Sequence, residues 1–226
     1  MKRFLILIAA LTFGSVLFCS CERDPLPEED NTNIPLVPIS LTKGEQEVAN
    51  SANAFGLNVY RALYQEDQML FSPLSLSLAL SMTACGADGT TAEQMSSTLG
   101  FNGIDPEDIA GYYNKMTGSL STIDKKTTFE SANSIWIDKN FSVKKDFLSM
   151  TEDYFAAEEK SVSFMDPSTV EAINKWCSDK THGKIEKMLD GLDPQTVMAL
   201  INAIYFNGKW GIDFDEKTRK EDFTAI

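Results

Sequence analysis

The sequence predicts an α+β fold, because the predicted helices and strands follow one another without strict alternation. Two segments carry this prediction. Residues 72–86 begin with a serine N-cap and a proline at the first helical position, and they form a helix that is apolar all round. Such a helix is typical of the centre of a large core. Residues 197–206 are apolar at nine of ten positions, which favours a strand covered on both faces.

The first half of the chain is expected to be mainly helical. Apolar residues at helical spacing predict an amphipathic helix over residues 44–65, ahead of the apolar helix. Thr90 and Glu93 predict a capping box that begins a third helix, and Gly100 is expected to end it. A weaker helix is expected over residues 105–120, which begin with Asp-Pro.

Strands and helices are mixed in the second half of the chain. Residues 127–138 are rich in Thr, Phe, Ile and Trp and predict a strand, and residues 160–164 predict a shorter one. Residues 144–155 are expected to be helical. A second helix is expected over residues 168–182, since they begin with a Ser-x-x-Glu capping box and are followed by a glycine. The Asn-Gly pair at 207–208 is expected to turn the chain.

Composition argues against several classes of function. With 33 acidic against 20 basic residues, the chain has a net charge of −13, which disfavours nucleic acid as a partner. The sequence shows no phosphate-binding loop and no paired-cysteine metal motif outside its first 21 residues, so neither a cofactor nor a metal is expected. His182 is the single histidine, and beside Gly183 at a helix end it suits the helix dipole. We therefore expect a protein without catalytic residues of its own, not an enzyme.

The N-terminal residues 1–21 are typical of an export signal. Two basic residues precede an apolar run over residues 4–18, which is short for a bilayer span. The segment resembles a bacterial lipoprotein signal. Cys21 is the expected lipid acceptor, because small Ser20 precedes it whereas a bulky phenylalanine precedes Cys19. Ordinary signal cleavage is the alternative.

Residues 22–40 are rich in proline and acidic residues, a composition that favours an extended tether over a packed segment. The protein is thus expected to be exported and held by lipid at a bacterial membrane, facing the periplasm or the extracellular space. Cys85 and Cys177 are expected to be free thiols that pack as small apolar side chains, although two cysteines in an exported chain could also pair.

Several motifs, taken together and in order, resemble the serpin family, whose members are large, conformationally labile inhibitors of serine proteases. They span residues 41–226. The motifs are FSPLS at 71–75, ANSIW at 132–136, THGKI at 181–185, LINAIYF at 200–206 and GKW at 208–210. The resemblance implies a serpin fold, in which helices surround a large mixed sheet, sheet A.

The resemblance also implies a serine-type endopeptidase inhibitor that works as a covalent suicide trap. A protease would cleave an exposed reactive loop and form an acyl-enzyme, and the loop would then insert beside the strand at 197–206. The implied partner is a serine or a cysteine protease, and the complete protein would be monomeric. A non-inhibitory serpin that acts as a binding or chaperone module is the alternative.

Particular residues match regions with known roles in the family. Ser72, Ser75 and Asn202 match the polar "shutter" where sheet A opens, and Trp210 matches the "breach" where insertion starts. A structural interpretation is open for each of them: helix capping, a satisfied buried amide and a buried aromatic anchor. The helix at 168–182 would lie across the sheet and yield during insertion.

The sequence departs from the family pattern at its end, because a serpin continues well past Ile226. The 226 residues are therefore expected to be the N-terminal portion of a serpin domain, incomplete at the C-terminus and without a reactive bond. Alone, they are expected to be inactive and poorly soluble, since the strand at 197–206 would keep an unpaired apolar edge.

Overall fold

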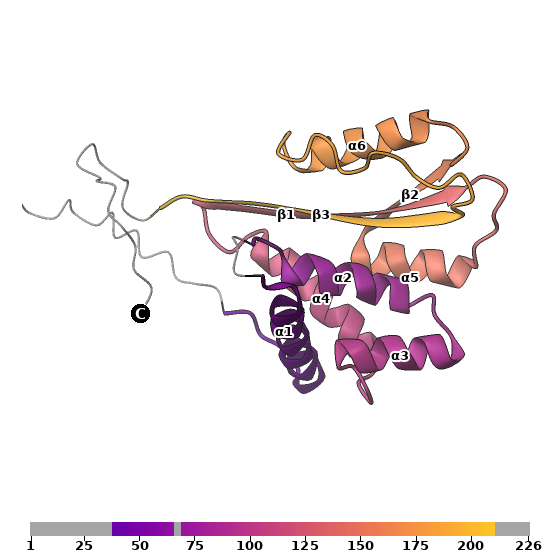
Figure 1. The fold of residues 1–226 in the computed structure, drawn as a ribbon. Helices are drawn as coiled ribbons and strands as arrows, with labels where there is room; N and C mark the ends of the chain where they lie inside the picture. The colour runs from indigo at the N-terminus through magenta and orange to yellow at the C-terminus, as the bar shows by residue number, and fades with distance from the viewer. Residues whose placement is uncertain (1–37, 66–68, 211–226) are drawn as a thin grey trace, which may run out of the picture. The chain divides into compact units, whose positions relative to one another are not determined.

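The computed structural model describes residues 38–65 and 69–210. All of these up to Lys209 belong to one compact unit, in which a sheet lies between helices (Figure 1). The export signal, the lipid acceptor Cys21 and nearly all of the tether fall outside the described residues, so those expectations remain predictions.

The sheet has three strands, in the order β2-β1-β3 among the described residues. Central β1 (Thr127–Asp138) pairs in parallel with β2 (Ala157–Val162) and antiparallel with β3 (Met198–Gly208). The predicted mixed sheet is confirmed, but two local predictions need correction. The strand expected at 160–164 begins earlier, at Ala157. The pair at 207–208 makes no turn, because both residues continue the ladder with β1.

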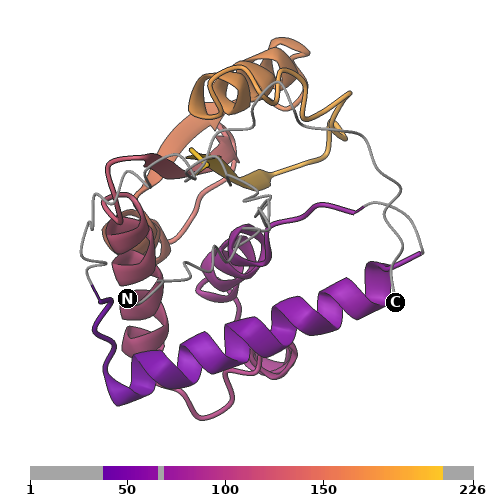
Figure 2. The same ribbon diagram turned by 90° about the vertical axis from the view of Figure 1, so that its left-hand side faces the viewer.

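Helices cover both faces of this sheet (Figures 1 and 2). One face, which we call the crowded face, carries α1 (Lys43–Leu63), α2 (Pro73–Ala84), α3 (Gly89–Leu99), α4 (Pro106–Leu120) and α5 (Lys145–Phe155). The opposite face carries α6 (Ser168–Lys180). The strand β3 packs against α2, which in turn contacts α1 and α3, while α4 and α5 lie under β1 and β2.

Short-range hydrogen bonds explain where several helices begin. The Ser72 hydroxyl accepts a hydrogen bond from the Ser75 amide at 3.2 Å and caps α2, as the sequence predicts. Asp105 caps α4 in the same way, and Pro106 follows at the first helical position. Gly100 ends α3 with a left-handed backbone (φ 76°), which glycine adopts without steric cost.

Two predicted capping boxes are wrong. Asp88, not Thr90, caps α3, because its carboxylate accepts a hydrogen bond from the Gly89 amide at 2.8 Å. At α6 the Asp166 carboxylate accepts a hydrogen bond from the Ser168 amide at 2.9 Å, and the Ser168 side chain caps nothing. In both places an aspartate just upstream accepts a hydrogen bond from an amide at the first turn of the helix.

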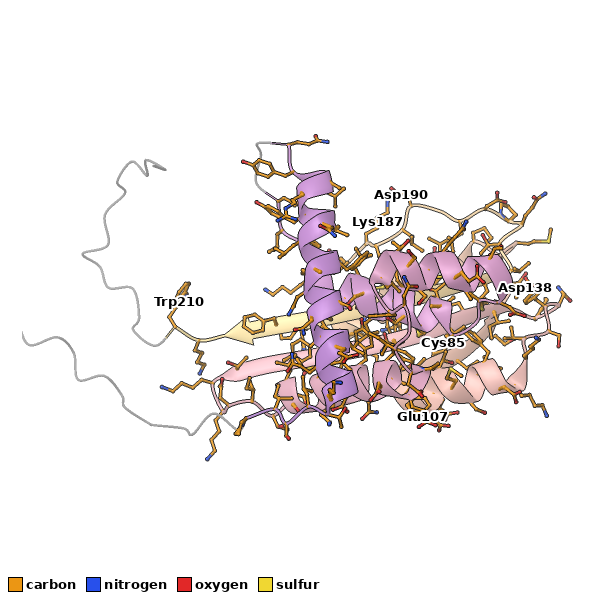
Figure 3. The ribbon with its side chains drawn as sticks, turned by 90° about the horizontal axis from the view of Figure 1, so that it is seen from below. Cys85, Glu107, Asp138, Lys187, Asp190 and Trp210 are labelled. Atoms are coloured by element: carbon orange, nitrogen blue, oxygen red, sulfur yellow. The ribbon has the colours of Figure 1, made fainter. Side chains whose placement is uncertain are left out.

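The core divides into two clusters, one on each face of the sheet, because side chains alternate along each strand. On β1, Ile135 and Ile137 join the cluster beneath the five helices, whereas Trp136 joins the cluster beneath α6. Cys85 packs against the first cluster and Cys177 lies in the second (Figure 3 labels Cys85). Both thiols are free.

The apolar helix α2 is only partly enclosed. Leu78 and Met82 are fully buried, but Leu76 keeps 36% of its surface exposed. The sequence predicts a helix that is covered on every side. The described residues cover one side of it. None of the helices in residues 38–65 and 69–210 is both long and apolar enough to cross a membrane.

Candidate functional site

The polar side chains predicted for the shutter meet where α2 lies against β3. The Ser75 hydroxyl donates a hydrogen bond to Oδ1 of Asn202. The hydrogen bonds of Asn202 do not include Ser72, whose hydroxyl caps the helix at the amide of Ser75. The structure therefore brings Ser75 and Asn202 into direct contact and leaves Ser72 to hold the helix end that presents Ser75.

A second amide, Asn133 on β1, extends this contact across the sheet. It is the register partner of Asn202, and Nδ2 of Asn202 donates to Oδ1 of Asn133 at 2.9 Å. The Asn133 amide in turn donates to the carbonyl oxygen of Phe155, at the end of α5, at 2.6 Å. Four elements, α2, β3, β1 and α5, are thus joined by one line of side-chain hydrogen bonds, which we call the amide line (Ser75, Asn202, Asn133).

Asn133 was missed as a site residue when the sequence was read alone. It is almost fully buried, and its side chain points to the same face as Ile135 and Ile137. The signal that singled out Asn202, an amide within an apolar run, was absent for Asn133, because residues 127–138 mix polar and apolar side chains. Only the strand register shows that the two amides are opposite each other.

On the other face, charged groups hold α6 to the edge strand β2. The Glu158 carboxylate pairs with Lys180 at 2.6 Å and with Lys160 at 2.9 Å, and Nε1 of Trp176 donates to it at 3.2 Å. Hydrogen bonds from Lys180 and Lys160 lower the pKa of Glu158 to about 2. This carboxylate is therefore charged at any ordinary pH and fastens the C-terminal half of α6.

His182 lies just past α6, which ends at Lys180 and not at His182 as the sequence predicts, and its side chain reaches the sheet. Its Nε2 is 2.8 Å from a carboxylate oxygen of Glu130 on β1. Its ring lies against Tyr205 on β3, with 4.4 Å between the ring centroids. The helix dipole alone, on which the sequence interpretation relied, does not account for these two contacts.

The structure leaves the predicted breach residue untested. Trp210 is the last described residue and falls in a different compact unit from the sheet. It is 70% exposed, so the structural alternative of a buried aromatic anchor is not met. Among the described residues, no three His, Cys, Asp or Glu side chains are grouped so that they could hold a metal ion.

The strand β3 lies at an edge of the described sheet, since the only strand that it pairs with there is β1. Its side chains alternate, with Leu200 and Asn202 toward α2 and Ile201 and Ala203 toward α6. The centre of the strand is therefore packed on both faces, although Phe206 near its end is 69% exposed, and within the described part of the chain no strand pairs with its other edge. Such an edge can accept one further strand.

Comparisons of sequence and of structure with known proteins point to the same family. Residues 50–226 match the family model described as serpin (serine protease inhibitor). Iripin-2 of Ixodes ricinus is 34% identical over 198 residues, which cover 84% of this chain and 50% of that protein. Intracellular coagulation inhibitor 2 of Tachypleus tridentatus is 33% identical, over 77% of this chain and 44% of its own length.

A solved structure of the thermophilic serpin tengpin in the latent state is similar as well. It has a TM-score of 0.71 and 37% identity, over 78% of this chain and 47% of that one. The chain thus spans about half the length of the relatives that it matches.

Proposed function

Since the chain belongs to the serpin family, we propose that its described part is the receiving half of a serine protease inhibitor, with β3 as the strand beside which a cleaved reactive loop inserts. Serpins are in general protease inhibitors rather than catalytic enzymes. The observation that carries the proposal is the position of β3, which is packed between α2 and α6 at its centre, is tied to α2 and β1 by the amide line, and has no second partner strand among the described residues.

The proposed chemistry takes place on the protease. Its serine hydroxyl attacks the carbonyl of the reactive bond, the peptide bond breaks, and the amine leaves with a proton while an ester forms. Insertion of the cleaved loop beside β3 would carry the acylated protease away and distort it before water hydrolyses the ester. The target is a serine or a cysteine protease, and the complete inhibitor acts as a monomer.

The amide line supports this role through its position. A strand that inserts at the open edge must form hydrogen bonds to β3 without pulling β3 away from its neighbours. Asn202 holds β3 from two sides, through Ser75 on α2 and Asn133 on β1. We therefore propose that Ser75, Asn202 and Asn133 keep β3 in register while the sheet expands, and that Ser72 positions Ser75.

A protease assay tests the proposal, made on a version of the domain extended to the length of the relatives. It is incubated with a panel of serine proteases, and the expected result is a complex that survives boiling in detergent. A protease whose catalytic serine is replaced by alanine serves as the control and should form none. Cleavage of the loop without any stable complex would contradict the proposal and favour a non-inhibitory serpin that acts as a binding module.

We further propose that Cys21 carries lipid and anchors the exported protein at a membrane. The support is the sequence pattern, small Ser20 before the cysteine and the acidic, proline-rich segment 22–40 after it. Labelling of cells with a fatty acid should tag the wild type and Cys19→Ser, and the tag should be lost in Cys21→Ser. Equal labelling of all three proteins would overturn this proposal.

A further inference from the structure

We propose that His182 and Glu130 form a pH-sensitive clasp that holds the end of α6 on the sheet more firmly in mild acid than at pH 8. The clasp comprises these two side chains and Tyr205, against which the imidazole packs. The proposal goes beyond the proposed function, because it concerns how α6 is attached to the sheet and needs neither a protease nor a reactive loop.

The backbone at the end of α6 places the imidazole over the sheet. His182 and Gly183 are both left-handed, with φ of 50° and 75°, and the Gly183 amide donates to the Ser178 carbonyl oxygen at 2.8 Å. A left-handed backbone is uncommon for a residue other than glycine, although histidine tolerates it better than most. The exit of the helix therefore has a specific geometry, from which the His182 side chain reaches β1 and β3.

The His182 side chain contacts two strands. Glu130 on β1 and Tyr205 on β3 are register partners, so they lie next to each other on the α6 face of the sheet. The His182 ring meets the Glu130 carboxylate at 2.8 Å and the Tyr205 ring at 4.4 Å between centroids, with the ring planes inclined by 53°. The clasp consequently bridges the exit of α6 to both β1 and β3.

Other charged groups flank the clasp on α6 and in the segment after it. Lys180 on α6 is paired with Glu158 on β2 at 2.6 Å. Lys184, in the segment after α6, lines the same hollow as Tyr205. On β1 and β3 the titratable partners of the ring are Glu130 and Tyr205. An imidazole is the side chain whose charge ordinarily changes between about pH 5 and 8.

Protonation strengthens this contact. A neutral imidazole and a carboxylate share one hydrogen bond, whereas an imidazolium and a carboxylate form a charge-assisted pair. The His182 and Glu130 side chains are each about half exposed, with 52% and 49% of their surfaces accessible, so solvent and salt reduce the gain. The gain from protonation is therefore modest.

Hydrogen exchange of the backbone amides in α6 tests the clasp on the full chain. Rates are measured at pH 5.5 and 8.0 and corrected for the intrinsic pH dependence of exchange. We expect the opening equilibrium of residues 168–180 to be about two- to fivefold less favourable at pH 5.5 than at pH 8.0, as a half-exposed ion pair allows. The difference should disappear in Glu130→Gln.

Matched variants separate the imidazole from its backbone. His182→Asn removes the ring but keeps a residue that adopts the left-handed backbone readily, and it should abolish the pH difference. Asp179→Asn removes the exposed Lys175–Asp179 pair of the same helix and should leave the difference intact. A wild type without a pH difference, or a His182→Asn variant that retains it, would overturn the proposal.

Discussion

The two faces of the sheet are covered in different ways, although both belong to the same three strands. Beneath α1–α5 lies a cluster of fifteen buried hydrophobic residues, and the amide line crosses it at the sheet surface. Beneath α6 the cluster contains seven, and the helix is fastened at its rim by Glu158 and by His182. One face is held mainly by buried surface, and the other depends in part on charges that water can reach.

This difference predicts which of the two faces opens more easily by local unfolding. Opening the crowded face exposes a large apolar surface and unpairs the amide of Asn133, which is buried, whereas lifting α6 exposes less and breaks contacts that solvent can replace. We therefore expect α6 to detach locally before the rest of the unit unfolds. The proposed inhibitor mechanism requires that behaviour, because α6 lies on the face that an inserting strand must pass.

The largest effects are expected from truncating one fully buried side chain on each face. Leu78→Ala in α2 should lower the free energy of unfolding of the whole unit by about 2–5 kcal/mol, since it leaves a cavity in the larger cluster. Ile173→Ala in α6 removes an equally buried side chain, but its effect should fall mainly on local opening of α6. Urea denaturation and hydrogen exchange distinguish the two outcomes.

The expectation that α6 detaches locally would be contradicted if Ile173→Ala lowered the urea midpoint as much as Leu78→Ala. The same expectation would be contradicted if, in the Ile173→Ala variant, the hydrogen-exchange rate of α6 rose no more than that of α2.

The amide line gives a prediction for the crowded face. Asn202→Ala removes an acceptor for Ser75 and a donor to Asn133, and it should cost about 1–3 kcal/mol of stability. Asn207→Ala, an exposed amide on the same strand, is the matched control and should stay within about 0.5 kcal/mol of the wild type. Equal melting temperatures for the two variants would show that the line contributes nothing.

The Glu158 contacts give a smaller, pH-dependent effect on the α6 face. Lys180 and Lys160 lower the pKa of Glu158 to about 2, below its value in the unfolded chain. The stability that this carboxylate contributes is therefore full at neutral pH and is lost as pH falls from about 4.5 toward 2.

Because the group is partly exposed, Glu158→Gln should cost under about 1 kcal/mol at pH 7. The difference between wild type and variant, followed by urea denaturation, should vanish near pH 2. A difference that grew on acidification would contradict the assignment of the ion pairs.

The smallest effect is expected from the two core thiols, which lie on different faces of the sheet. Burial raises the pKa of Cys85 to about 11 and raises that of Cys177 as well, so both should be slow to alkylate in the native protein at pH 7.5. After unfolding without reductant, both should react completely. Peptide mass spectrometry measures this, and a protected pair would mean that the two cysteines had met, which contradicts the two-face arrangement.

Much of this structure follows from patterns that span a few residues. The N-cap Ser72 and the left-handed Gly100 were predicted where the structure has them, and β1 runs over the predicted residues 127–138. These signals are local, because a cap acts on amides two or three positions away and strand alternation repeats every second residue. The motifs that resemble serpins indicated the family for the same chain before any contact was known.

The tertiary structure alone decided which side chains meet. Ser75 and Asn202 are separated by 127 residues, Asn202 and Asn133 by 69, and His182 and Glu130 by 52. No local preference relates such residues, because their contact depends on strand register and on which helix packs against which face. For that reason the sequence by itself determined the elements and the family. The amide line and the clasp depend on the folded arrangement, in which the sheet lies between α1–α5 on one face and α6 on the other.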